Sequence, residues 1–231
     1  MVNRTSVRRM LEVRDTEGLQ RLARAHRRTL SLLLGLTYSP DEAVAWRAVE
    51  GLGVAAAAVA EEDPEFVRGI LRRLLWSLSD ESGGIGWKAP QALGAIVAAR
   101  PDLFWGFVPL ILSLFELEEE TFRPGTLWAA GQIALRDASL VQGAAPWVLT
   151  CLDHPDPATR GHACWCAGCL ALAEARPRLE ALAEDPAEVP FFAHGALHRR
   201  TVGALAREAL AHLEGQRTRT PEPVLKEGGN G

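Results

Sequence analysis

Four glycines recur at nearly equal intervals along the chain, and each one closes a segment of the same pattern. Gly53, Gly94, Gly131 and Gly168 are separated by 41, 37 and 37 residues. The segments that end on them are "SPDEAVAWRAVEGLG", "SDESGGIGWKAPQALG", "LEEETFRPGTLWAAG" and "HPDPATRGHACWCAG". A period of 20 to 50 residues is typical of repeat architectures, so the chain is predicted to be an array of similar units.

Each segment has the pattern of a capped helix with an apolar stripe. The residue five positions before the glycine is small, and the residue one position before it is Leu or Ala. Twelve positions before the glycine stands a side chain that accepts hydrogen bonds from the free N–H groups of a helix start. These predicted caps are Asp41, Ser82, Glu119 and Asp156. Pro90 and Pro124 fall inside the pattern, so those two helices are expected to kink or to begin late.

A second, Leu-rich helical segment precedes each of the later units. These segments span 63–78, 100–115 and 144–152, and each has a Pro close to its start. Pro is tolerated in the first turn of a helix because the N–H that it lacks would be unpaired there. The unit is therefore a helix–turn–helix of nearly 40 residues. Neither helix can bury its stripe alone, so neighbouring units must stack into an α-solenoid.

The repeat resembles HEAT repeats, in particular the HEAT-like type first named from phycobilisome lyases and found in bacteria. The signature of that type is an Asp-Pro turn followed by V-R-x-x-A-x-x-A-L-G, and "DPATRGHACWCAG" and "DEAVAWRAVEGLG" are similar to it. The resemblance covers about residues 17–213, with four clear units and a degenerate fifth. It implies an all-α superhelix of about five helical hairpins whose second helices line a concave surface. It implies no particular activity.

The chain is predicted to form a single repeat domain over residues 1–213. An N-terminal cap covers 1–38, with helices over about 4–13 and 17–37, and the repeats cover 39–186. The C-terminal cap covers 187–213, where Phe191 to Arg199 predict a small β-hairpin and Thr201 is placed to cap the last helix. Residues 214–231 have no periodicity and are expected to be a disordered tail.

Tryptophans recur once per unit in the predicted second helices. Trp46 and Trp87 stand seven residues before the reference glycine, and Trp128 and Trp165 stand three residues before it, which is the same side of a helix. Aromatic rings beside Arg are frequent in binding hot spots. The predicted partner-binding ladder is Trp46, Arg47, Glu50, Trp87, Lys88, Gln91, Trp128, His162 and Trp165. The alternative is that the rings pack between adjacent repeats, next to the glycines.

The glycine-rich stretch 79–87 suggests an anion site. Free N–H groups at Ser82, Gly83, Gly84 and Gly86 would lie at the positive end of a helix, where a carboxylate or a phosphate binds. The stretch lacks the Lys of a P-loop and the preceding strand of a dinucleotide fold. The simpler interpretation is therefore a loose turn at the edge of the array.

The four cysteines lie between residues 151 and 169, with two histidines among them. His162, Cys166 and Cys169 at i, i+4 and i+7 could offer three ligands to a metal ion. The equivalent positions in other units are mainly Val, Leu, Ala and Gly, which favours small buried thiols. We therefore predict no metal and no other cofactor.

Charge and composition argue against two classes of partner, nucleic acids and membranes. Residues 1–30 carry eight Arg against three acidic residues, while the whole chain has a net charge of −4, which disfavours nucleic-acid binding. No apolar run reaches the length that spans a bilayer and the start lacks a signal-peptide core, so we expect a cytoplasmic protein that binds no membrane.

No catalytic constellation is evident, and the chain has no His-Glu dipeptide of the kind that binds iron in the HEAT-like hydroxylases. We expect a non-catalytic scaffold that binds a protein or peptide on its concave face. The alternatives are a protein that depends on an anion or metal, and a lyase-type chaperone of a cofactor-bearing partner. Oligomeric state is not predicted.

Overall fold

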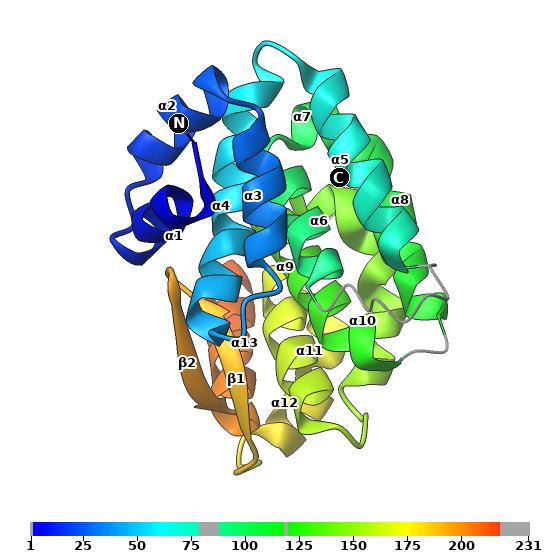
Figure 1. Cartoon of the computed structure of the whole chain (residues 1–231). Coiled ribbons are helices and arrows are strands. Elements are labelled where there is room, and N and C mark those ends of the chain that lie inside the picture. The colour runs from blue at the N-terminus through cyan, green and yellow to red at the C-terminus, as the bar shows by residue number, and fades with distance from the viewer. Residues whose placement is uncertain (1, 79–87, 118–119, 218–231) are drawn as a thin grey trace, which may run out of the picture.

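The chain folds into an all-α array of paired helices with one small β-hairpin (Figure 1). A computed structural model describes residues 2–78, 88–117 and 120–217. The first three helices are α1 (Arg4–Glu12), α2 (Thr16–Ala25) and α3 (Arg28–Leu36). The predicted single helix over 17–37 is wrong, because His26 takes extended dihedral angles and ends α2. The break lets both α2 and α3 pack against α4.

The helices that follow form two layers. The inner helices pack one after another along the array and are α4 (Glu42–Ala60), α6 (Ala89–Ala99), α9 (Arg123–Asp137), α11 (Pro157–Cys169) and α13 (Val202–Arg217). The outer helices are α5 (Pro64–Leu78), α7 (Pro101–Phe104), α8 (Val108–Leu112), α10 (Ala145–Cys151) and α12 (Arg176–Leu182). Short 3-10 turns connect them: η1 (Trp105–Phe107), η2 (Ser113–Glu116), η3 (Glu120–Phe122), η4 (Ala138–Ala144) and η5 (Ala173–Ala175).

The repeat glycines mark the points where successive inner helices touch. A β-carbon at Gly53 would lie 2.7 Å from the carbonyl oxygen of Ala95, so only glycine lets α4 and α6 approach this closely. Gly94 and Gly168 likewise lie against the backbone of the next inner helix, whereas Gly131 lies against a side-chain ring of the next inner helix. The pairs are Gly53 with Ala95, Gly94 with Ala129, Gly131 with Trp165 and Gly168 with Ala209. The predicted repeat and its all-α stacking are confirmed.

Two of the four predicted helix caps lie in the part of the chain that the structure describes. Asp41 accepts hydrogen bonds from the N–H groups of Ala43 and Val44, and Asp156 accepts one from Thr159. Ser82 and Glu119 lie outside the described residues. The helices with internal prolines begin late, α6 at Ala89 and α9 at Arg123, so that Pro90 and Pro124 stand in the first turn, where proline is tolerated.

The outer segment 100–115 departs from the expected single helix. It is divided into α7, η1, α8 and η2, because Pro109 lacks a backbone N–H and starts a new helix in α8. At the other end, α13 continues to Arg217, which is four residues into the segment expected to be a disordered tail. The rest of that tail, from residue 218, lies outside the described residues.

The predicted β-hairpin is present. Strands β1 (Glu188–Ala193) and β2 (Ala196–Thr201) pair antiparallel, with Glu188 opposite Thr201 and Ala193 opposite Ala196. The two turn residues, His194 and Gly195, both have positive φ, as the tight hairpin turn requires. The hydroxyl of Thr201 accepts a hydrogen bond from the N–H of Ala204 and caps α13 as expected. Figure 1 shows the hairpin lying beside α4, a helix that comes much earlier in the chain than the helix α12 that directly precedes the hairpin.

One helix of the described chain, α4, is long and apolar enough to cross a membrane by length and composition. In this fold 72% of its most apolar window is buried inside the protein. Its apolar character is explained by its position, because α2, α3, α5 and α6 all pack against it.

Candidate functional site

Side chains at four-residue spacing on α4, α6 and α9 point to one side of the inner layer, which we call the inner face. On α4 these residues include Trp46, Glu50 and Val54, and on α9 they are Trp128, Gln132 and Arg136. Residues four apart on a helix lie above one another, so each helix contributes one row. The rows on α4 and α9 begin with a tryptophan and continue into polar and apolar residues, and the row on α6 includes the small residues Ala95 and Ala99.

The β-hairpin covers the tryptophan end of the inner face. The ring of Phe192 stacks on Trp46 with 5.2 Å between ring centroids, and Trp46 also meets the Trp128 ring edge at 5.2 Å. The indole N–H of Trp128 donates a hydrogen bond of 3.2 Å to the carbonyl oxygen of Phe192. Phe191 meets Trp165 at 5.4 Å. The hairpin thus occupies the surface that was expected to receive a partner.

The structure therefore favours the packing alternative for the tryptophans that it describes. Trp46 and Trp128 are only 6% and 3% exposed. Trp165 is half-buried, and its ring lies directly against Gly131, where a β-carbon would collide with it. While the hairpin is in place, Trp46 is covered, Trp128 contributes only an edge to the pocket described below, and Trp165 is partly covered. Trp87 lies outside the described residues.

The other members of the predicted ladder have separate environments. The Arg47 guanidinium donates to the carbonyl oxygen of Glu12, and Lys88 pairs with Glu42 at 3.0 Å while lying over the Trp46 ring. Gln91 is buried, and its side-chain oxygen has no hydrogen-bond partner among the described residues. Of the ladder, Glu50 and Trp128 reach the pocket described next.

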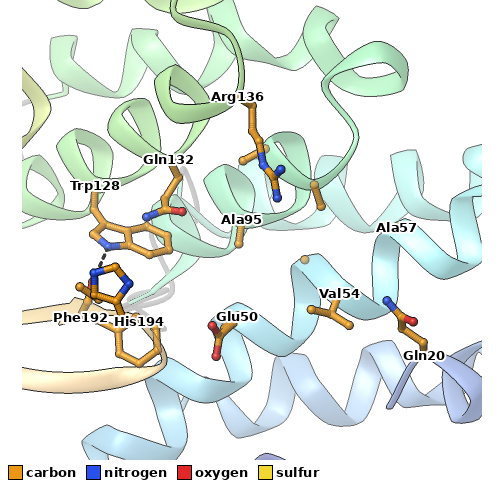
Figure 2. Close-up of a pocket in the computed structure, with 14 residues that line it drawn as sticks. Gln20, Glu50, Val54, Ala57, Ala95, Trp128, Gln132, Arg136, Phe192 and His194 are labelled. Carbon is orange, nitrogen blue, oxygen red and sulfur yellow. Dashed lines mark hydrogen bonds between the residues drawn. The ribbon is translucent and has the colours of Figure 1, made fainter. Parts of the chain in front are cut away.

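A pocket of about 390 Å³ opens on the inner face beside the hairpin (Figure 2). Its walls come from α2, α4, α6 and α9 and from the tip of the hairpin. The floor consists of small or apolar residues, and polar side chains surround it. The floor includes Gly53, Val54, Ala57, Ala95, Ala98 and Ala99, and the polar residues are Gln20, Glu50, Gln132, Arg136 and His194. This volume and this mixed lining are typical of a ligand site.

The charged side chains of the pocket face it from opposite sides. Figure 2 shows Glu50 rising from α4 on one side and Arg136 extending from α9 on the other. Glu50 is half-buried and Arg136 is exposed. Within the described residues neither side chain has an ion-pair partner, and the two do not pair with each other. Both charges are therefore free to meet a ligand.

The cysteine and histidine side chains do not form a ligand set. His162 is buried and its ring N–H at Nδ1 donates to the carbonyl oxygen of Ala158 at 2.8 Å, while burial lowers the pKa of the imidazole. Burial raises the pKa of the Cys169 thiol to about 12 and that of Cys166 well above its ordinary value. No group of three His, Cys, Asp or Glu residues suited to a metal occurs within the described ranges. The candidate His162, Cys166 and Cys169 is thus not supported as a site, and the thiols are buried packing groups.

The candidate anion site cannot be compared with the structure. Ser82, Gly83, Gly84 and Gly86 all belong to the stretch 79–87, which lies outside the described residues.

Several pocket residues were not predicted from the sequence. Gln132 and Arg136 follow Trp128 by four and eight residues, so extending the Trp row along α9 would have identified them. Gln20 and His194 come from α2 and from the hairpin tip. No sequence period connects these two residues to the repeats, so only the tertiary fold brings them to the pocket.

Comparison with known proteins gives limited matches. No protein-family model matches the chain. An uncharacterized protein of Archaeoglobus fulgidus is 34% identical over 110 residues, which are 47% of this chain and 56% of that protein. The match therefore spans about half the length of this relative. The crystal structure of an archaeal HEAT-like repeats protein from Thermococcus onnurineus NA1 is 20% identical, covers 98% of this chain and 84% of its own, and has a TM-score of 0.42.

Proposed function

We propose that the protein is a non-catalytic interaction module that holds a segment of a partner protein in the inner-face pocket. The observation that carries the proposal is a set of five polar side chains around an apolar floor, two of them charged and without ion-pair partners in the described chain. The half-buried carboxylate of Glu50 is stabilised by a ligand that brings an opposite charge, and the exposed Arg136 can meet a ligand at the rim. A stacked array of helices provides a rigid frame for such a site.

The chemistry of the pocket favours binding over catalysis. No Ser, Thr, Cys or Lys lines the pocket among the described residues, so it offers no hydroxyl, thiol or amine nucleophile. The buried cysteines cannot serve from elsewhere, since burial raises the pKa of Cys164 to about 12 and keeps its thiol protonated. The rim is open, with Arg136 and His194 both exposed. A chain segment of another protein can therefore enter the pocket.

Site-specific photo-crosslinking in an extract of the source organism tests this function. A photoreactive phenylalanine analogue replaces Gln132 inside the pocket, and a matched protein carries it at Arg73, an exposed residue of the outer helix α5. We expect the pocket position to give a discrete adduct that the α5 position does not give. A second substitution, Ala57→Phe, fills the floor and should abolish the adduct.

The control is that Ala57→Phe protein keeps the circular dichroism spectrum and melting temperature of its parent. Adducts that form equally from Arg73, or that persist in folded Ala57→Phe protein, would show that the partner does not use this pocket.

A further inference from the structure

The pocket carries one negative and one positive side chain that are both left without a protein partner. Elsewhere on the surface, charges that link neighbouring helices are paired, such as Arg24 with Glu61 at 2.8 Å and Lys88 with Glu42 at 3.0 Å. Glu50 is half-buried and lacks any such pairing in the described chain. A partly buried carboxylate that forms no ion pair is stabilised by a cation brought by a ligand, so its side of the pocket is suited to a cationic group.

A purely cationic ligand does not fit the whole pocket. Arg136 faces the cavity from the opposite wall, and the His194 imidazole lies at the rim (Figure 2). On the far side of Glu50, Arg14 and Arg47 line a small adjoining cleft and add further positive charge. A purely anionic ligand is equally unsuited, because it would meet the Glu50 carboxylate. Only a ligand with both signs of charge is complementary to both walls.

The uncharged surfaces of the pocket fit the body of a peptide. Ala95, Ala98 and Ala99 form an apolar floor on which the methylene groups of a long basic side chain can lie. Gln20 and Gln132 stand on either side, and neither side chain makes a hydrogen bond within the described residues. Their amides can both donate to and accept from peptide groups. The hairpin tip closes one end through Ala193 and His194.

We infer that the pocket recognises a mixed-charge peptide segment of the partner, with a Lys or Arg side chain directed to Glu50 and an acidic side chain directed to Arg136. This inference rests on the proposed function and specifies its ligand. The acidic and basic groups fix the direction of the segment across α4 and α9, because reversing it would bring like charges together.

Binding of short synthetic peptides tests the inference. The probes are pools of fluorescent five-residue peptides with acetylated and amidated ends, so that only side chains are charged. One pool has Lys and Glu separated by one residue, a second has Lys alone, a third has Glu alone and a fourth has neither. Fluorescence anisotropy with the full-length protein measures Kd. We expect the mixed-charge pool to bind at least 10-fold more tightly than the other three.

Substitutions assign the charges. Glu50→Gln and Arg136→Gln should each raise the Kd of the mixed-charge pool about 10-fold, and Glu50→Gln should weaken the Lys-only pool without weakening the Glu-only pool. The matched controls are Glu174→Gln and Arg73→Gln, which remove exposed charges outside the pocket. Both controls should leave Kd unchanged.

The outcomes separate this inference from the proposed function. If all pools bind alike and only Ala57→Phe abolishes binding, the pocket is a peptide site and the charge assignment is wrong. If no pool binds, or binding is unaffected by Ala57→Phe, both the inference and the proposed function are wrong. Selective binding of the mixed-charge pool that is lost in both Gln variants supports the inference.

Discussion

At the scale of single residues, the repeat glycines determine how closely the inner helices pack. Each glycine faces the next helix where a β-carbon has no room, and Gly94 lies against the backbone of Ala129. Not every helical glycine has this role. Gly69, inside α5, has open space where its β-carbon would be. Alanine substitutions at Gly94 and at Gly69 therefore separate the effect of close helix packing on stability from the effect of helix propensity.

Gly94→Ala is predicted to destabilise the protein by about 2 kcal/mol, because the added methyl group forces α6 and α9 apart. Gly69→Ala is predicted to stabilise it by about 1 kcal/mol, since alanine is the better helix former and meets nothing. Urea denaturation followed by circular dichroism measures both changes. Equal effects of the two substitutions would contradict the role of Gly94 as a packing contact.

At the scale of elements, the hairpin is held at its base by a partly buried ion pair. Arg160 of α11 donates to Asp185 from Nε at 3.1 Å and from a terminal nitrogen at 2.8 Å, and their side chains are 18% and 15% exposed. Asp185 also accepts from the N–H of Ala187, immediately before β1. Burial acts to raise the pKa of Asp185, but the hydrogen bonds from Ala187 and Arg160 outweigh it and lower the pKa.

Asp185→Asn is predicted to cost about 2 kcal/mol at neutral pH, the range for hydrogen bonds to charged groups. A carboxylate with a lowered folded-state pKa stabilises the fold above its ordinary pKa, and this stabilisation is lost as the pH falls through the folded-state value. The difference in unfolding free energy between wild type and variant should therefore have its full size at pH 6 and should decrease below about pH 4. Urea melts at several pH values measure it.

The control for this pair is Asp153→Asn. Asp153 pairs with Arg178 at 2.7 Å on the exposed surface, so its loss should cost less than about 1 kcal/mol. A pH-independent cost of Asp185→Asn would argue against the charged pair as the source of its stabilisation.

At the scale of the whole molecule, the hairpin changes the nature of the array. In a simple solenoid each repeat contacts only its neighbours, and unfolding can proceed unit by unit. Here β1 contacts α11 and β2 contacts α4, so the hairpin connects early and late repeats. The stacking of Phe192 on Trp46 is the aromatic part of this connection.

We predict a single cooperative unfolding transition, with tryptophan fluorescence and circular dichroism changing together in urea. Phe192→Ala should cost about 3–5 kcal/mol and should separate the two signals, because the connection between distant repeats is lost. Phe104→Ala, which removes a buried ring from α7 in the outer layer, should destabilise the fold without separating them. Coincident transitions in both variants would show that the hairpin does not couple the repeats.

The sequence by itself determined the repeat and the local structure. The glycine interval, the caps at Asp41 and Asp156 and the turn at His194 and Gly195 are local patterns with direct physical causes, and they predicted the stacked helices and the hairpin. The sequence predicted that the tryptophans share one side of the inner helices. It could not predict whether they are exposed, because exposure depends on which segment packs against them.

Only the tertiary structure decided where the hairpin lies and, with it, which part of the inner face stays open. The hairpin contacts α4, more than 120 residues earlier in the chain, and no sequence period specifies such a long-range contact. Burying Phe191 and Phe192 against the tryptophans places them in the core and leaves a pocket between Glu50 and Arg136. Apolar burial is non-directional, so the sequence predicts that these rings will be covered but not by which segment.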